Sequence, residues 1–185
     1  MATIQHDVLR DFGAAIFKAT GNLPDDQCKA AIDHLVDANL SGHDSHGIIR
    51  LPGYTKSLLD GGIKAVNPKV MREGPGVQVW DANNSFGIVL ARTAMQTAVD
   101  MAKDHSFGAV GVYHSSHIGR LGDFPPLAAE QGYIGALFLN GGGHFTAPFG
   151  GTSRRLPPNP ISFSVPTPGP YPMMLDMTTS MAAGG

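Results

Sequence analysis

Apolar residues recur at helical spacing through the N-terminal third of the chain. A first helix is predicted over residues 4–19, and its apolar side consists of Val8, Phe12, Ala15 and Ile16. A second helix is expected to begin at Asp25 or Asp26 and to end before Gly42, with apolar positions at Cys28, Ile32, Leu35, Val36 and Leu40. A third helix is predicted over residues 47–60, with Pro52 in its first turn, where proline is tolerated.

The pattern changes after residue 68 to short extended runs bounded by glycine and proline. Residues 70–73 and 77–81 flank Gly74-Pro75-Gly76 and predict a hairpin, which a long helix over residues 85–103 follows.

Further along, two strands and a helix predict a β-α-β unit. The strands are expected over residues 107–113 and 134–139, and the helix over residues 119–130. This unit implies a sheet that is at least partly parallel. After a loop over residues 141–160, two more strands are expected at residues 161–165 and 172–175.

These elements together predict an α/β fold with two parts. Residues 1–68 form a helical N-terminal segment, and residues 69–185 form a sheet region with flanking helices and a mixed, partly parallel sheet.

Composition narrows the class of protein. Apolar residues make up 42% and charged residues 15% of the 185 positions, as in globular proteins. The formal net charge of -2 provides no basic surface for nucleic acid or anionic membranes, so neither is expected as a partner. The single cysteine excludes an internal disulfide framework and, with no signal-like N-terminus or membrane-spanning stretch, favours the cytoplasm.

The run from Ser41 to Arg50 carries the densest chemistry. His46, Arg50 and Tyr54 are spaced four residues apart, so a continuous helix would place them along one stripe. Arginine offers a fixed, always charged fork for a carboxylate, and a helix starting near Gly47, with Asp44 or Ser45 at its cap, would favour an anion. The alternative is that Ser45 is a helix cap and that His46 and Arg50 are solvated surface residues.

His117 is the second candidate. It follows a predicted strand at its carboxyl end, where α/β sheets place ligands, and imidazole can act as acid or base near neutral pH. The alternative is a histidine that only hydrogen-bonds a loop carbonyl. Ser115 and Ser116 are expected to tie the loop, since no Gly-x-Ser-x-Gly elbow surrounds them.

Standard nucleotide and metal motifs are missing from the sequence. No Gly-x-Gly-x-x-Gly follows a strand and no P-loop motif occurs, so any nucleotide is held in another way. His43 and His46 lack a third ligand at metal-site spacing, and no metal is expected.

Five motifs now carry a resemblance. They are Ser45-His46-Gly47 with Arg50 and Tyr54, Ser115-Ser116-His117, Pro148-Phe149-Gly150-Gly151, Asn159-Pro160, and Leu175-Asp176-Met177-Thr178-Thr179-Ser180. In this order they resemble the N-terminal half of the malate/L-lactate dehydrogenase family, which also includes sulfolactate and ureidoglycolate dehydrogenases and diketogulonate and piperideine-2-carboxylate reductases. The resemblance implies a non-Rossmann α/β fold, a homodimer, and hydride transfer between NAD or NADP and a small 2-hydroxy or 2-oxo acid.

The resemblance also implies roles for individual residues. His117 or His46 is expected to exchange the proton with the substrate oxygen, and we favour His117, with His46 and Ser45 as hydrogen-bonding partners. Arg50 would hold the substrate carboxylate beside Tyr54. Asp176, Met177 and Thr178 match the stretch that contacts the dinucleotide.

The chain departs from the family pattern at two places. His144 stands where some relatives carry a lysine near substrate and nicotinamide, and we assign it to both contacts. Pro157-Pro158 replaces the Gly-Thr of many members before Asn159-Pro160, which predicts a stiffer loop.

Two other functions stay open. One is a non-catalytic remnant that acts only through dimer association, and it predicts exposed apolar surface and no cofactor binding. The other is a metal-dependent hydrolase using His43, His46 and His117.

Overall fold

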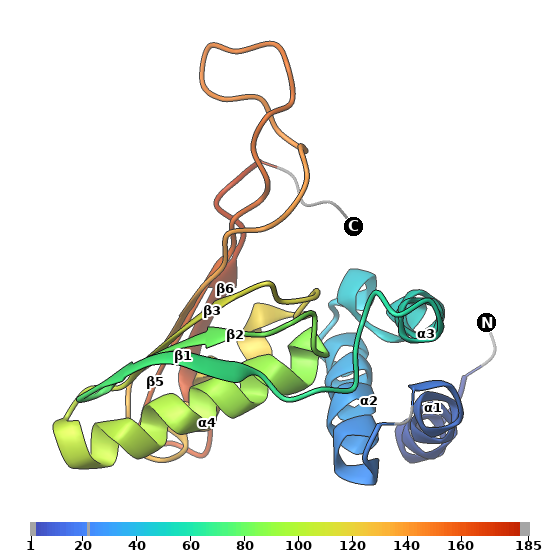
Figure 1. The fold of residues 1–185 in the computed structure, drawn as a ribbon, viewed down its shortest axis with the longest axis horizontal. Coiled ribbons are helices and arrows are strands. Elements are labelled where there is room, and N and C mark those ends of the chain that lie inside the picture. The colour runs from blue at the N-terminus through green and yellow to red at the C-terminus, as the bar shows by residue number, and fades with distance from the viewer. Residues whose placement is uncertain (1–2, 22, 182–185) are drawn as a thin grey trace. The chain divides into compact units, whose positions relative to one another are not determined.

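The computed structural model describes residues 3–21 and 23–181, which fall into two compact units, Met1–Arg120 and Leu121–Gly185 (Figure 1). The first unit contains the predicted helical segment and the first sheet, and the second contains another sheet. The division predicted between residues 68 and 69 marks the change from helices to strands, and as a domain boundary it stays a prediction.

Helices α1 (His6–Gly21) and α2 (Asp25–Leu40) confirm the first two predicted helices. The side of α1 that is buried differs from the prediction, because Val8 and Phe12 are 59% and 62% exposed. The cause is Gly13, where an added Cβ would lie 2.1 Å from the Ile32 side chain, so α2 packs onto this turn. Phe17 is fully buried on that side.

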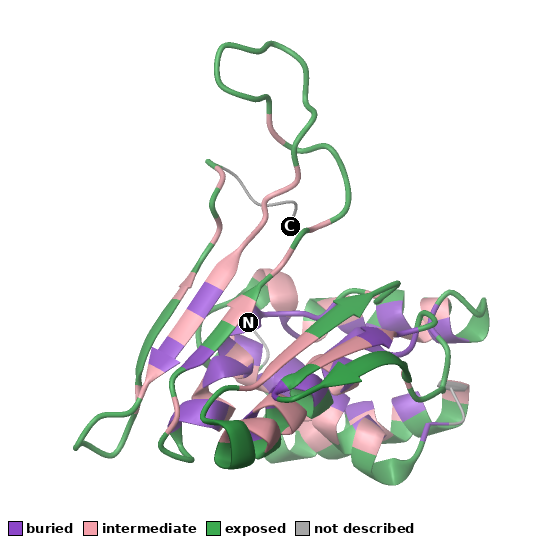
Figure 2. Cartoon of the chain, turned by 60° about the vertical axis from the view of Figure 1, so that its left-hand side comes forward, coloured by how far each residue is buried: buried purple, intermediate pink, exposed green. Residues whose placement is uncertain are grey.

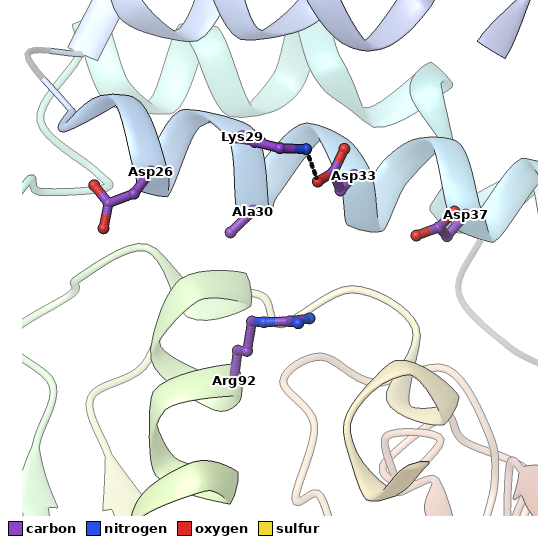
Figure 3. A pocket seen from close by; sticks show the side chains of 6 residues that line it. All are labelled: Asp26, Lys29, Ala30, Asp33, Asp37 and Arg92. Carbon is purple, nitrogen blue, oxygen red and sulfur yellow. Dashed lines mark hydrogen bonds and ion pairs between the residues drawn. The ribbon is translucent and has the colours of Figure 1, made fainter. Parts of the chain in front are cut away.

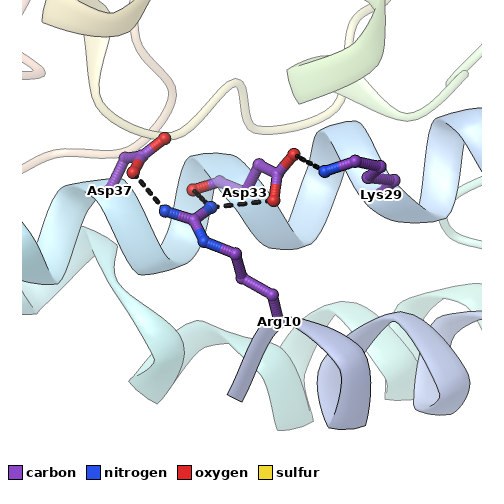
Figure 4. Close-up of polar contacts among 4 residues, drawn as sticks. All are labelled: Arg10, Lys29, Asp33 and Asp37. Atoms are coloured by element: carbon purple, nitrogen blue, oxygen red, sulfur yellow. Dashed lines mark hydrogen bonds and ion pairs between the residues drawn. The ribbon is translucent and has the colours of Figure 1, made fainter. Parts of the chain in front are cut away.

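Arg10 joins α1 to α2 on their polar side. Its guanidinium donates to the carboxylates of Asp33 and Asp37 at 2.8 and 2.5 Å, and Lys29 pairs with Asp33 at 2.7 Å (Figure 4). One arginine thereby bridges two successive turns of α2, which fixes the register of the helix pair.

The third predicted helix is shorter than expected. Two 3-10 turns, Asp44–His46 and Ile48–Arg50, precede α3 (Leu51–Leu59), in which Pro52 lies in the first turn as predicted. Between the turns, Gly47 is extended, with φ −86° and ψ −152°. The helix therefore cannot begin at Gly47.

The sheet of the first unit contains β1 (Lys69–Gly74), β2 (Val77–Asp81) and β3 (Ala109–Tyr113) in that order. The β1–β2 hairpin is antiparallel, as predicted, and turns at Gly76 with φ +70°. The β2–β3 pair is parallel and is connected by the long helix α4 (Gly87–His105). The sheet is thus mixed and partly parallel, as predicted.

The β-α-β prediction for residues 107–139 is wrong in its pairing. The parallel unit is β2–α4–β3, whereas β4 (Gly135–Phe138) pairs with β5 (Ile161–Val165). The predicted helix over residues 119–130 is reduced to a 3-10 turn, Leu121–Asp123, and the short α5 (Pro125–Ala129). Two adjacent prolines at the start of α5 remove amide donors, which limits helix growth toward the N-terminus.

The sheet of the second unit is antiparallel, in the order β4–β5–β6, with β6 at Met173–Met177. Only the central strand buries side chains deeply, at Ser162 and Ser164, while much of β6 is exposed (Figure 2). Both serine hydroxyls donate to backbone carbonyls of β6, at Leu175 and Met173. Among the described residues, no helix is long and apolar enough to cross a membrane.

Candidate active site

Asn39, near the end of α2, shapes the segment that carries Ser45 and His46. Its side-chain oxygen accepts the Ile48 N–H at 2.8 Å, and its amide nitrogen donates to Asp44. An added Cβ on Gly47 would lie 2.2 Å from the Asn39 oxygen, so only glycine lets the chain pass this close. The glycine of the Ser-His-Gly motif is explained by this contact.

The predicted helical stripe of His46, Arg50 and Tyr54 is therefore wrong. His46 and Arg50 lie in the two 3-10 turns and Tyr54 in α3, with the extended Gly47 between the turns. Neither Asp44 nor Ser45 caps α3, whose capping position is Arg50 without a side-chain hydrogen bond.

His117 lies in the loop that follows β3, as predicted, and Ser116 holds this loop. The Ser116 hydroxyl accepts the Gly87 N–H at 2.8 Å and donates to the Ser85 carbonyl at 2.8 Å. The N-terminus of α4 has no capping side chain of its own, so Ser116 satisfies one of its free amides. Ser116 thus ties the loop, as the sequence predicts.

Tyr54 and His117 form the central contact of the site. The Tyr54 hydroxyl lies 2.6 Å from Nδ1 of His117, and the Gly119 N–H also points at Nδ1, at 3.3 Å. Because an amide can only donate, Nδ1 acts as acceptor, and the neutral imidazole carries its hydrogen on Nε2. His117 is therefore not a histidine that only bonds a loop carbonyl.

His46 lies against the same imidazole. The rings of His46 and His117 stack with centroids 5.6 Å apart and an interplanar angle of 25°. The Ser45 hydroxyl lies 2.9 Å from Nδ1 of His46, so Ser45 is a hydrogen-bonding partner within the site.

Arg50 closes the cluster and is half-buried. Its Nε donates to the Ser45 carbonyl at 2.6 Å, which orients the guanidinium beside the histidines. Its charge also lowers the pKa of both imidazoles. Arg50 is therefore not a freely solvated helix residue.

The environment keeps both histidines neutral near pH 7. Burial, the neighbouring His117 and His43, and the Arg50 charge lower the pKa of His46 to about 4. Desolvation, then Arg50 and His34, lower the pKa of His117. Although His117 retains exposed surface, its Nδ1 edge is covered by Tyr54, which is 6% exposed and whose own pKa burial raises.

His34, a residue of α2 that is only 2% exposed, was not singled out from the sequence. Its Nε2 accepts the Arg120 N–H at 3.0 Å, within the segment that follows His117. The signal available in the sequence was a histidine within the apolar periodicity of the second helix, where a solvated charge does not fit.

The remaining predicted site residues belong to the second unit. Asp176, on β6, accepts the Gly122 N–H at 2.8 Å, and the Thr178 hydroxyl donates to the Pro158 carbonyl at 3.0 Å. Met177 is 46% exposed on β6. His144 lies exposed in the long loop between β4 and β5. Their assigned contacts with cofactor and substrate stay predictions.

A separate groove of about 280 Å³ lies between α2 and α4. Figure 3 shows Arg92 of α4 facing the acidic side of α2; the lining residues are Asp26, Lys29, Ala30, Asp33, Asp37 and Arg92. Small-molecule sites are mostly apolar, whereas this lining is almost entirely charged, and Arg10 and Lys29 already pair with Asp33. None of the predicted site residues lines it.

Within residues 3–21 and 23–181, no group of three histidine, cysteine or carboxylate side chains is arranged to hold a metal. His43 contacts His46 edge to face, with ring centroids 5.1 Å apart. This is a ring-to-ring contact, and it gives the metal-hydrolase alternative no observation in its favour.

Comparisons with known proteins identify the family and the fold of the chain. The malate/L-lactate dehydrogenase family model matches residues 4–185. A malate dehydrogenase of Pyrococcus abyssi is 38% identical over 184 residues, covering 98% of this chain and 50% of that protein. An L-sulfolactate dehydrogenase of Methanocaldococcus jannaschii is 35% identical, covering 97% of this chain and 49% of that protein.

A solved structure extends the likeness to three dimensions. The malate dehydrogenase of Pyrococcus horikoshii OT3 superimposes with a TM-score of 0.93 at 33% identity, covering 98% of this chain and 52% of that one. The expected non-Rossmann fold of this type is confirmed. The chain spans about half the length of the curated relatives it matches. By sequence and by structure, this chain belongs to the malate/L-lactate dehydrogenase family.

Proposed function

We propose that this chain serves an oxidoreductase that interconverts a small 2-hydroxy acid and its 2-oxo acid, with NAD or NADP as hydride carrier. The observation that carries the proposal is the cluster of His117, Tyr54, His46 and Arg50, in which acid–base groups lie beside an arginine. The carbon that bears the hydroxyl gives up hydride only as its oxygen loses a proton. The reaction therefore needs an acid–base group beside a group that binds the substrate carboxylate.

In the reduction direction, Arg50 binds the substrate carboxylate and His117 donates the proton. Once Nδ1 is protonated, the Tyr54 oxygen can accept the new N–H while the imidazolium presents its Nε2 proton to the substrate oxygen. Loss of that proton leaves neutral His117 with its hydrogen on Nδ1. Nε2 then carries the lone pair that removes the hydroxyl proton in the reverse reaction.

The substrate carboxylate also changes the pKa of His117. Arg50 lowers the pKa of His117 in the free chain, so a bound carboxylate that neutralises Arg50 raises it again. The proton needed for reduction is therefore taken up more readily when substrate is present.

We assign the cofactor contacts to Asp176, Met177, Thr178 and His144. The side chains of the second unit fit such a group chemically, because Met177, at the end of β6, offers an exposed thioether, and Asp176 and Thr178 on either side of it carry oxygens that can accept further hydrogen bonds. A bound nicotinamide supplies the hydride, which no side chain can supply.

We further propose that the chain associates with a second copy and acts in the cytoplasm. The support for association is an exposed apolar stripe along the start of the chain and α1, with Ile4, Val8 and Phe12 each about 60% exposed. The support for a reducing compartment is Cys28, a buried free thiol. A sedimentation experiment that finds only monomers, at all concentrations tested, would contradict the dimer.

The test of function is a titration of the purified chain with NADH and NADPH, followed by nicotinamide fluorescence and thermal stability. Pyruvate, oxaloacetate and other 2-oxo acids are then added. Saturable binding with acid-dependent oxidation of the nicotinamide is the expected result. A folded chain that associates but binds neither nucleotide would overturn the proposal and favour the non-catalytic alternative.

A further inference from the structure

We propose that His34 is a positioning residue for His117: it fixes the Gly119–Arg120 backbone so that the Gly119 N–H is held on Nδ1 of His117. Resting His117 then keeps its hydrogen on Nε2, the nitrogen that meets substrate. The functional meaning of this proposal rests on the proposed dehydrogenase activity, whereas the hydrogen-bond arrangement itself does not.

His34 packs directly on Gly119. His34 lies in the middle of α2 and is 2% exposed, while Gly119 has φ +78°. A Cβ added to Gly119 would lie 2.0 Å from Nε2 of His34. Only glycine therefore satisfies both this backbone angle and the approach of the imidazole.

Two successive backbone amides are bound by two histidines. The Arg120 N–H donates to Nε2 of His34 at 3.0 Å, and the Gly119 N–H points at Nδ1 of His117 at 3.3 Å. The two amides belong to the peptide planes on either side of Gly119, so with His34 packed on Gly119, holding the Arg120 amide limits the rotation about φ and ψ of Gly119 that would turn the Gly119 amide away. A buried amide without its acceptor costs free energy, so this arrangement resists rotation.

The Gly119 amide also bears on which nitrogen of His117 carries the hydrogen. Two groups contact Nδ1, namely the Gly119 amide and the Tyr54 hydroxyl. The hydroxyl can donate or accept and so permits either tautomer, whereas the amide is satisfied only while Nδ1 accepts, so a hydrogen on Nδ1, as in the imidazolium and directly after proton donation, costs this contact. The Gly119 amide, and through it His34, therefore selects the tautomer that presents Nε2–H toward a substrate oxygen.

The test is nitrogen NMR of the histidine side chains in the full 185-residue chain, without nucleotide or substrate. This readout reports which ring nitrogen of His117 carries hydrogen and does not depend on enzyme activity. The variants are His34→Leu, which removes the acceptor, and His34→Gln, whose side-chain oxygen can accept the Arg120 N–H. The matched control is His43→Gln, an exposed neighbour that contacts His46.

In the unmodified chain we expect His117 to carry hydrogen on Nε2. In His34→Leu the fraction with hydrogen on Nδ1 should rise roughly twofold to tenfold, the range of one lost hydrogen bond. His34→Gln and His43→Gln should stay close to the unmodified chain. The pKa of His117, which faces Tyr54, His46, Arg50 and His34, should rise in His34→Leu, because an amide donor that opposes protonation is released.

An unchanged tautomer in a folded His34→Leu variant would overturn the proposal. If that variant does not fold, Gly119→Ala probes the same contact from the other side, since the added methyl displaces the backbone from His34. An unchanged tautomer there would equally overturn it. If the tautomer of His117 shifts as expected in His34→Leu but the chain binds no nucleotide, the positioning role of His34 stands and only the dehydrogenase function is rejected.

Discussion

Replacing Tyr54 with phenylalanine removes one oxygen from the centre of the site and little else. The Tyr54 ring packs 5.3 Å from the Phe86 ring and is 6% exposed, so phenylalanine keeps the core contact. The lost group is the hydroxyl 2.6 Å from Nδ1 of His117. One such hydrogen bond contributes about 1 kcal/mol net, so the free energy of unfolding should fall by about that amount.

The same change should slow turnover more than it weakens binding. Without Tyr54, the Nδ1–H of protonated His117 loses its acceptor at the moment of proton donation, which corresponds to about a tenfold lower kcat. KM for the 2-oxo acid should change little, because Arg50 is untouched. Steady-state kinetics of Tyr54→Phe beside Tyr133→Phe, a tyrosine of the second unit, measures this. Equal kcat in both variants would refute the assigned contact.

Three further predictions concern the charge, the pH dependence and the backbone of the site. Arg50→Lys should raise KM for carboxylate substrates and leave KM for uncharged analogues unchanged, because lysine lacks the planar fork. An equal rise in KM for both substrate classes would contradict carboxylate binding by Arg50. The pKa of His46 is about 4 and that of His117 is also lowered, so the unfolded chain binds more protons. Stability measured by urea unfolding should therefore fall as the pH drops from about 6.5 toward 4, and less steeply in His46→Gln. Gly47→Ala should lower the unfolding midpoint because its Cβ would meet the Asn39 side chain, whereas Gly53→Ala, where nothing lies within 4 Å, should not.

The sequence predicts the elements of the fold better than their pairing. Helical periodicity predicted α1 and α2, and Gly74-Pro75-Gly76 predicted the β1–β2 hairpin. Periodicity gave the wrong buried side for α1. Glycine carries no apolar side chain and so does not count in a hydrophobic pattern, yet Gly13 allows Ile32 of α2 to pack closely on this helix. Strand partners were missed because β3 and β4 each satisfy their hydrogen bonds in different sheets, a choice that local spacing does not encode.

The site was predicted by residue type and not by geometry. His46, Arg50, Tyr54 and His117 were singled out for their chemistry, and the structure brings them together. The continuous helix expected to align three of them does not exist, because the Asn39 side chain holds Gly47 extended. Asn39 and His34 were not singled out, since their roles depend on contacts with residues distant in the sequence.

We assign to His117 the proton transfer in a nicotinamide-dependent reaction of 2-oxo acids. The most direct measurement compares the chain and its His117→Ala variant for oxidation of NADH or NADPH by a panel of 2-oxo acids. Nucleotide binding is measured in both by fluorescence. We predict acid-dependent turnover in the chain, and a kcat at least about 100-fold lower in the variant with nucleotide binding retained. Equal turnover in the two proteins would contradict the account.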